Sequence, residues 1–255
     1  MDTYILKIYR GLPGKQYWEE FELPLRQKET VISGLMEIQK KPINRKGKKV
    51  TPIVWEQGCL EEVCGSCSML VNGFPRQACT ALIADYLKKQ PQKAIILAPF
   101  TKFPLVRDLI VDRSVMFENL KTIHGWIDTE DAPKKGFGPL ISQSKQKVMY
   151  ALSACMTCGC CSEACPQVNK NSQFTGPASI SLARFYNAHP TGKMQRHLRL
   201  RSMMEEGGIS DCGNAQNCVE VCPKNIPLTD SIALIGRDVT LQALRDVFNL
   251  QERRD

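Results

Sequence analysis

The sequence predicts an α+β protein with a small β-rich domain followed by a helical domain. Three observations lead to this prediction: alternating polarity near the N-terminus, Pro-Gly and Asn-Gly turn signals in the first part of the chain, and apolar residues at helical spacing beyond Val148. The length of 255 residues suffices for two cores. We expect a first domain over residues 1–105, a connecting helix and linker over 106–145, and a helical domain over 146–255.

Strands and one helix make up the predicted first domain. A Gly-Leu-Pro-Gly turn joins two alternating segments, and Asn72-Gly73 divides a third segment into a hairpin. Thr30 is placed to cap a helix over residues 31–41, which ends at Pro42. The segments that carry strand signals are residues 3–10, 16–25, 68–79 and 94–100.

Helices dominate the rest of the chain. Residues 108–126 show a helical pattern, whereas residues 131–147, rich in Lys, Gly, Pro and Ser, are typical of a linker. Further helices are predicted over residues 179–188, 198–206 and 229–248.

Composition excludes several classes of protein. Twelve cysteines in 255 residues fall below the roughly 8–10% that marks secreted disulfide scaffolds. The N-terminus, MDTYILKIYR, lacks the run of a secretory signal, and the longest apolar stretch, residues 94–100, is far shorter than a spanning helix of about 20 residues. We therefore expect no membrane span and a reducing compartment, in which the cysteines serve metal or redox chemistry.

The first cysteine group predicts a 2Fe-2S cluster. Its pattern, C-x4-C-x2-C-x11-C, is the plant-type spacing, in which one loop holds three thiolates and a neighbouring strand supplies the fourth. Gly58 and Gly65 suit such a loop because backbone amides must approach the sulfurs closely. A structural zinc site is the alternative, but zinc sites usually pair two C-x2-4-C knuckles. The four residues are Cys59, Cys64, Cys67 and Cys79.

The other cysteines form an internal repeat. The run from Cys155 to Cys165-Pro166 is the full bacterial ferredoxin motif, and a second copy ends at Cys222-Pro223 with Ala215 at its second position. In two-cluster ferredoxins the fourth cysteine of each run binds the other cluster. The 4Fe-4S ligands are then Cys155, Cys158, Cys161 and Cys222. Three thiolates and an alanine remain, which favours a 3Fe-4S cluster on Cys165, Cys212 and Cys218.

Some cysteine and histidine residues fall outside these ligand sets. Cys160 has no position in the repeat, so we predict a small buried apolar residue, with ligand exchange as the alternative. A pair of zinc knuckles is the alternative for the repeat as a whole, disfavoured because both copies end in Cys-Pro. His124, His189 and His197 show no metal-binding pattern with the cysteine runs.

These motifs resemble the iron-sulfur subunit of succinate dehydrogenase and fumarate reductase over nearly the whole chain. The resemblance implies a β-grasp, plant-type ferredoxin-like domain followed by an all-α, bacterial two-cluster ferredoxin-like domain. It also implies an electron-transfer subunit between an FAD-containing flavoprotein, which carries the succinate site, and a membrane anchor that binds quinone and can carry haem b. Besides the cysteine groups, the segments that carry it are CLEEVCGSCSMLVNG at 59–73, FPLVRDLIVDRS at 103–114 and CPKNIPL at 222–228.

In such a relay, the resemblance implies that the 2Fe-2S domain faces the flavin and the 3Fe-4S cluster lies nearest the quinone. The chain needs no catalytic residue of its own, because it places the clusters and tunes their potentials through hydrogen bonds and burial. It has no GxGxxG or Walker A motif, so FAD belongs to the partner. The implied location is the cytoplasmic face of the cell membrane, peripheral through the anchor, and the same relay serves succinate oxidation or fumarate reduction.

Two sequence positions bear on the type of quinone that the enzyme uses. Family members that reduce ubiquinone usually have a Trp a few residues after the cysteine matching Cys165 and a His directly after the one matching Cys212. Lys170 and Gly213 stand near those places here, so the resemblance is closer to menaquinone-using bacterial enzymes. A solvated loop is the alternative use of the segment after Cys165. The candidates for lining a quinone pocket are Pro166, Gln167 and Lys170.

Two other functions are compatible with the cysteine motifs and the charge of this sequence. An iron-sulfur relay of another flavoprotein dehydrogenase has the same motifs, and a zinc-stabilised basic module could use the formal charge of +8 to bind nucleic acid. Each ligated thiolate adds one negative charge, and three loaded clusters lower the +8 to about +2. We therefore expect no nucleic-acid partner.

Overall fold

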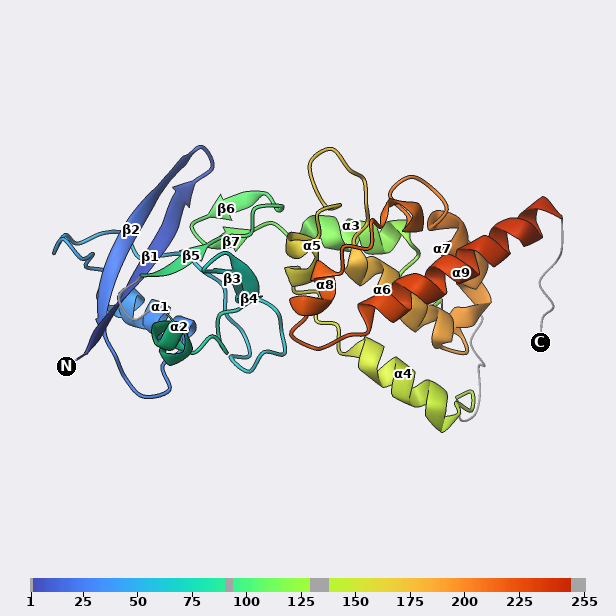
Figure 1. Ribbon diagram of the computed structural model, residues 1–255, viewed down its shortest axis with the longest axis horizontal. Coiled ribbons are helices and arrows are strands. Elements are labelled where there is room, and N and C mark those ends of the chain that lie inside the picture. Colours follow the sequence, from blue (N-terminus) through green and yellow to red (C-terminus); the bar gives the residue numbers. More distant parts are fainter. Residues whose placement is uncertain (1, 90–93, 129–137, 249–255) are drawn as a thin grey trace. The chain divides into compact units, whose positions relative to one another are not determined.

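The computed structural model describes residues 2–89, 94–128 and 138–248, which divide into two compact units (Figure 1). The first unit comprises the chain up to Arg113 together with the segment Cys158–Glu163. The second comprises Ser114–Thr157 and the chain from Ala164 onward. Part of the first bacterial-type cysteine run therefore belongs to the N-terminal unit.

A mixed sheet forms the centre of the first unit, with the described strands in the order β2-β1-β5-β3-β4. The predicted N-terminal hairpin is confirmed, because β1 and β2 pair antiparallel along their full length. The second hairpin is confirmed too: Asn72 and Gly73 both have positive φ in the two-residue turn between β3 and β4. β5 pairs parallel to β1 and antiparallel to β3. The bounds are β1 (Thr3–Leu12), β2 (Lys15–Pro24), β3 (Ser68–Val71), β4 (Phe74–Gln77) and β5 (Ile95–Ala98).

Helix α1 (Val31–Lys40) packs against this sheet, and α2 (Ile83–Lys89) follows β4. Thr30 caps α1 as predicted, since its side chain accepts the N–H of Ser33 while the Ser33 hydroxyl oxygen accepts the N–H of Thr30. Gly34 permits the close approach, because a Cβ there would lie 2.6 Å from the Tyr4 hydroxyl. The core shared by β1 and α1 includes Tyr4, Leu6, Ile8, Val31, Leu35 and Ile38.

The prediction of a continuous helix over residues 108–126 is wrong at its start. A small hairpin, β6 (Leu105–Arg107) with β7 (Ile110–Val111), precedes the helix α3 (Ser114–Thr122). Asp108 makes the turn at a φ of 48°, and its carboxylate accepts the N–H groups of Gly11 and Val54 at 2.8 and 2.9 Å. These long-range bonds outweigh the local helical pattern. The hairpin belongs to the first unit.

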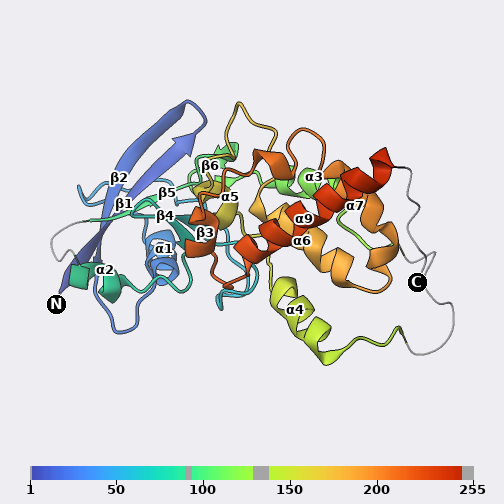
Figure 2. The same cartoon turned by 45° about the vertical axis from the view of Figure 1, so that its right-hand side comes forward.

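The described part of the second unit is helical, as predicted. Figures 1 and 2 show α6 and α9 side by side, and their apolar residues share one core with those of α7. Among the described residues, no helix has both the length and the apolar character needed to cross a bilayer. The remaining elements are α4 (Gln143–Ser153), α5 (Cys160–Ala164), α6 (Pro177–Ala188), η1 (Gly192–Gln195), α7 (Arg196–Ser202), η2 (Ile209–Asp211), α8 (Asn217–Glu220) and α9 (Leu228–Val247).

The predicted linker differs from the structure at its end. Residues 131–137 lie outside the described residues, but residues 143–147 form the first turns of α4. Ser142 caps this helix, and its hydroxyl accepts the N–H of Lys145 at 3.4 Å. The Gln and Lys residues that resemble a linker by composition are good helix formers after such a cap.

A fully buried arginine connects the elements of the second unit. The guanidinium of Arg199, on α7, donates to the carbonyls of His124, Trp126 and Gly192 at 2.9, 2.5 and 2.6 Å. The ring of Tyr186 lies 5.5 Å from it. Burial lowers the pKa of Arg199 below its ordinary value. Arg199 thus joins the segment after α3 to the segment between α6 and α7.

Candidate metal centres

The β3–β4 hairpin brings two cysteines of the first group together. Cys67 directly precedes β3, and Cys79 follows β4. Ser68 pairs with Gln77 across the hairpin, and the N–H of Ala78 donates to the Cys67 carbonyl at 3.1 Å. Both cysteines are buried. The plant-type spacing thus corresponds to a loop followed by a hairpin, as the sequence predicts.

The loop before β3 surrounds the sulfur of Cys59 with backbone amides. Leu60 and Glu62 hold positive φ values of 62° and 55°, which turn successive N–H groups toward one point. This concave arrangement suits a sulfur that binds a metal cluster, because each N–H is a hydrogen-bond donor to it. The N–H groups that donate to Cys59 Sγ, at 3.2–3.3 Å, belong to Glu61, Val63 and Cys64.

The sulfur of Cys64 lies in the same loop. The N–H of Cys59 donates to it at 3.4 Å and, with hydrogen bonds from Ser66, lowers the pKa of the Cys64 thiol to about 6. Gly58 lies against this sulfur, and a Cβ there would stand 3.0 Å from it. A glycine at position 58 therefore leaves the room that the sulfur occupies.

These surroundings fit a 2Fe-2S cluster. Burial raises the pKa of the Cys67 thiol to about 12, so we expect Cys67 to lose its proton only when a metal binds. The sulfurs of Cys59 and Cys64, by contrast, already receive N–H donors. Four thiols on one loop and one hairpin, with amides directed at the sulfurs, are the donor set that the group requires.

The segment Cys158–Glu163 is fixed to the first unit by two charged side chains. Arg113 donates to the carbonyls of Cys158, Gly65 and Ser66 at 3.3, 2.8 and 3.1 Å. The buried carboxylate of Glu163 accepts from the N–H and hydroxyl of Thr101 at 2.9 and 2.7 Å. The loop of the first cluster and part of the bacterial-type run are therefore held within one unit.

Cys160 is fully buried, which confirms the prediction of a buried residue. Its sulfur is also a polar contact, since Gln77 Nε2 lies 3.6 Å from Cys160 Sγ. A hydrogen bond from the Cys160 side chain lowers the pKa of Cys158 to about 7. Cys160 therefore makes polar contacts with Gln77 and Cys158 in addition to filling space in the core.

The four predicted 4Fe-4S ligands fall in different units. Cys158 and Cys161 belong to the first unit, whereas Cys155 and Cys222 belong to the second. Cys155 follows α4, and Cys222 follows α8. The N–H of Ile226 lies 3.4 Å from Cys222 Sγ, the same kind of amide-to-sulfur contact as in the first loop.

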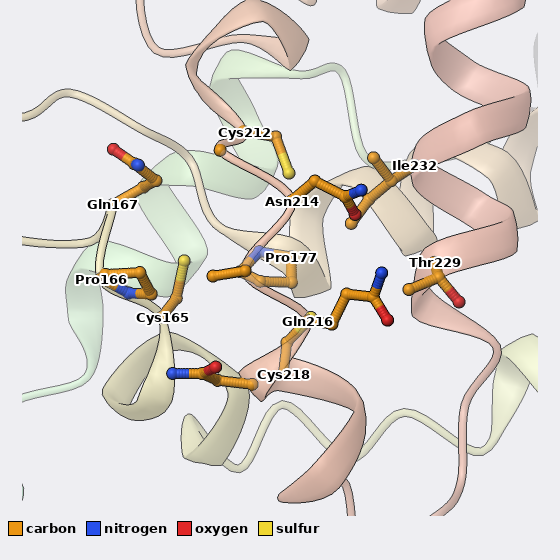
Figure 3. A pocket seen from close by; sticks show the side chains of 13 residues that line it. Cys165, Pro166, Gln167, Pro177, Cys212, Asn214, Gln216, Cys218, Thr229 and Ile232 are labelled. Carbon is orange, nitrogen blue, oxygen red and sulfur yellow. The ribbon is translucent and has the colours of Figure 1, made fainter.

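The predicted 3Fe-4S ligands line one pocket in the second unit. Figure 3 shows Cys165 approaching it from the segment after α5, and Cys212 and Cys218 from the segment that runs from the end of η2 into α8. Ala215 lines the same pocket. Burial, and then the neighbouring thiols of Cys165 and Cys212, raise the pKa of Cys218 to about 11. The three sulfurs are thus close enough to influence one another. The donor set fits a cluster with three thiolate ligands.

The loop over this pocket is strained and exposed. Asn214 and Gln216 have positive φ values of 50° and 63° on either side of Ala215. Such backbone costs of order 1 kcal/mol per residue and often occurs at functional sites. All three residues are exposed in the chain, so the pocket lies at the surface of the second unit.

Two of the three quinone candidates lie at this pocket. Pro166 and Gln167 line it, whereas Lys170 is exposed and stands outside the set of described residues that do so. Gln167 lies against Gly213, where a Cβ would be 2.5 Å from Gln167 Nε2. Gln167 therefore occupies the space that a histidine at position 213 would need.

Three further residues at these sites, Gln77, Arg113 and Glu163, hold no ligand position in the cysteine motifs. Gln77 is placed by strand register, and Arg113 and Glu163 act through contacts 45 or more residues away. For Gln77, the one local indication is a polar residue at the end of a strand, two residues before Cys79. Within the described residues, no three His, Cys, Asp or Glu side chains converge on a single-ion site.

The fold and the cysteine sites define an iron-sulfur electron-transfer protein with a ferredoxin-like β domain and a helical domain. Residues 5–118 match the family described as a 2Fe-2S iron-sulfur cluster binding domain. Residues 151–226 match the family described as a 4Fe-4S dicluster domain.

Relatives identify the protein family. The chain is 54% identical over 232 residues to the succinate dehydrogenase iron-sulfur subunit of Bacillus subtilis, covering 91% of this chain and 90% of the relative. It is 34% identical over 170 residues to the fumarate reductase iron-sulfur subunit of Escherichia coli O6:H1, covering 66% of each. The chain belongs to the iron-sulfur subunits of succinate dehydrogenase and fumarate reductase, and it is the electron-transfer subunit of such an enzyme.

A solved structure agrees with the fold. A chain of the Mycobacterium smegmatis Sdh1 complex in the apo form superposes with a TM-score of 0.78 at 22% identity. The match covers 94% of this chain and 96% of that chain. The predicted α+β class, with a ferredoxin-like domain before a helical dicluster domain, is confirmed.

Proposed function

We propose that this subunit passes electrons one at a time between the FAD of a flavoprotein partner and menaquinone bound at a membrane anchor. The anchor can also carry haem b, and the subunit sits through it at the cytoplasmic face of the cell membrane. The ligand sets are those of the cysteine spacing, with the 2Fe-2S group first, the 4Fe-4S group second and the 3Fe-4S group nearest the quinone. The same route serves succinate oxidation and fumarate reduction.

The pocket of Cys165, Cys212 and Cys218 carries this proposal. The second position of the repeat is Ala215, whose side chain has no atom that can bind iron. A site with three thiolates favours a 3Fe-4S centre, the group expected at the quinone end of the relay. The exposed loop over the pocket gives a partner or quinone access to this end.

The residues of the chain position and protect the clusters. When bound, the clusters supply one-electron carriers that join the two-electron chemistry of a flavin to that of a quinone. Backbone amides stabilise the thiolate of Cys59, and Arg113 holds the Cys158 loop against the Gly65 carbonyl. Burial of Cys67 and Cys218 keeps water away from their sulfurs.

The contact between Gly213 and Gln167 supports menaquinone. A histidine cannot fit at position 213 without displacing Gln167, so the pocket presents an amide where ubiquinone enzymes present an imidazole. We expect the complex to reduce a menaquinone analogue faster than a ubiquinone analogue under the same driving force. Equal or faster ubiquinone reduction would contradict this part of the proposal.

Low-temperature EPR of the isolated membrane complex tests the proposed relay. The oxidised complex should show a 3Fe-4S signal, and succinate should remove it and produce the signal of a reduced 2Fe-2S cluster. Identification of the copurifying flavoprotein, with other donors assayed in parallel, separates this enzyme from a relay on another dehydrogenase. Zinc without acid-labile sulfide would contradict the entire proposal.

A further inference from the structure

Gln77 is a fully buried amide between the loops of two proposed clusters. Its Nε2 donates to Ser68 Oγ at 2.8 Å and to Cys160 Sγ at 3.6 Å. Its Oε1 accepts from the thiol of Cys67 at 3.6 Å. Cys67 is a proposed 2Fe-2S ligand, and Cys160 lies between the proposed 4Fe-4S ligands Cys158 and Cys161. All of these residues belong to the first unit.

The orientation of the Gln77 amide suits a protonated Cys67 thiol but not a Cys67 thiolate that binds a cluster. A ligating cysteine is a thiolate, which has no proton to donate. Gln77 Oε1 would then face a second acceptor in a buried environment, which is unfavourable. A half-turn of the amide exchanges its oxygen and nitrogen without moving any other heavy atom.

The half-turn satisfies the neighbouring groups. Nε2 then donates to the Cys67 sulfur, and Oε1 accepts from the hydroxyl of Ser68 and the thiol of Cys160. The single thiol proton of Cys160 turns from Cys158 to Gln77, and the Cys158 sulfur keeps its hydrogen bond from the backbone N–H of Cys160. In the structure the Ser68 hydroxyl donates to the Gly65 carbonyl at 2.6 Å, and the half-turn breaks that hydrogen bond. That carbonyl keeps the guanidinium of Arg113 at 2.8 Å. No buried donor or acceptor in this group loses its only partner.

We propose that, in the loaded protein, Gln77 donates to the Cys67 sulfur of the 2Fe-2S cluster and accepts from Cys160, so that it tunes the first cluster and joins it to the loop of the second. This rests on the ligand sets of the proposed function. Gln77 is a positioning residue, because it acts through Cys67. Its N–H stabilises the added electron, since hydrogen bonds to cluster sulfurs raise the reduction potential.

Gln77→Met tests the proposal, because methionine is of similar length but has no N–H. Redox titration of the 2Fe-2S EPR signal should show an about tenfold lower equilibrium constant for reduction, or 59 mV for one electron. The 3Fe-4S signal should titrate unchanged, since its proposed ligands lie in the second unit. Gln39→Met, on the exposed end of α1, is the matched control and should change neither. An unchanged 2Fe-2S titration in Gln77→Met would overturn the proposal.

A measurement on the unaltered sequence does not depend on the folding of a variant. Protein labelled with ¹⁵N in the glutamine side chains should show a ¹⁵N coupling to the reduced 2Fe-2S cluster in pulsed EPR. Its absence, with the 2Fe-2S signal present, overturns the role of Gln77. Absence of the 2Fe-2S signal itself contradicts the proposed function instead, so the two failures can be told apart. Cys160→Ala should retain the coupling, because Gln77 still reaches Cys67.

Discussion

The two units build their cysteine sites in different ways. In the first, a loop and the adjoining hairpin supply all four thiols, and local backbone amides point at the sulfurs of Cys59 and Cys64. In the second, Cys165 and the loop of Cys212 and Cys218 meet only because separate segments pack around a pocket. The first site depends on local backbone geometry, and the second depends on the packing of the helical core.

The buried arginines of the two units show a related contrast. Arg10 in the sheet is neutralised by Glu19 and Asp108 at 2.9 and 3.4 Å. The described hydrogen-bond partners of Arg199 in the helical unit are carbonyl and amide oxygens, so no carboxylate accepts from it. The helical unit therefore holds a buried positive charge, whereas the sheet unit pairs its own. In the second unit this cation serves to connect segments that the sequence separates.

The largest expected effect comes from completing the second site. Ala215→Cys adds a fourth thiol, so we expect a 4Fe-4S centre in place of the proposed 3Fe-4S centre, with one more iron per chain and a lower potential. The oxidised EPR signal of the 3Fe-4S centre should disappear. Ala215→Ser, which adds a similar volume without a thiol, is the control. Retention of the signal in Ala215→Cys would show that the repeat is aligned wrongly.

Removal of Arg199 should destabilise the helical unit strongly. Arg199→Met leaves the carbonyls of His124, Trp126 and Gly192 without this donor, at a cost of about 3–5 kcal/mol in unfolding free energy. The melting temperature should fall by roughly 10 °C. Arg201→Met, which removes an exposed pair with Asp246, should cost less than about 1 kcal/mol. Equal effects of the two substitutions would contradict the role given to Arg199.

A smaller and local effect is expected in the first site. Gly58→Ala places a Cβ 3.0 Å from Cys64 Sγ, so the sulfur must move by a few tenths of an ångström. We expect about tenfold faster loss of 2Fe-2S iron to a chelator, with the other clusters unaffected. Gly138→Ala, where a Cβ meets no atom within 4 Å, is the control. The idea fails if the two variants lose iron at the same rate.

The smallest effect concerns the rim of the second site. Gly213→Ala pushes the Gln167 amide aside, because its Cβ would stand 2.5 Å from Gln167 Nε2. Holding the displaced side chain away from a preferred rotamer costs of order 1 kcal/mol, which corresponds to a change of about fivefold in KM for a menaquinone analogue. The spectrum of the 3Fe-4S centre should keep its shape. A KM within experimental error of the unaltered protein would place Gln167 outside the quinone site.

The sequence predicts features that depend on neighbouring residues better than features that depend on residues far away in the chain. The hairpins and the cap at Thr30 depend on neighbouring residues, and the sequence was sufficient for them. The hairpin at residues 105–111 was missed because Asp108 is held by Gly11 and Val54, far away in the chain. Gln77 was missed for the same reason, since its partner Cys160 is 83 residues away.

Iron, zinc and acid-labile sulfide analysis of the purified complex, quantified per chain, tests the central claim most directly. Eleven cysteines that hold one 2Fe-2S, one 4Fe-4S and one 3Fe-4S cluster require about nine irons and about ten sulfides from this subunit, with no stoichiometric zinc. Anchor haem is determined separately and subtracted from the iron total. Zinc in place of iron, or about ten irons with no 3Fe-4S signal, would contradict the account.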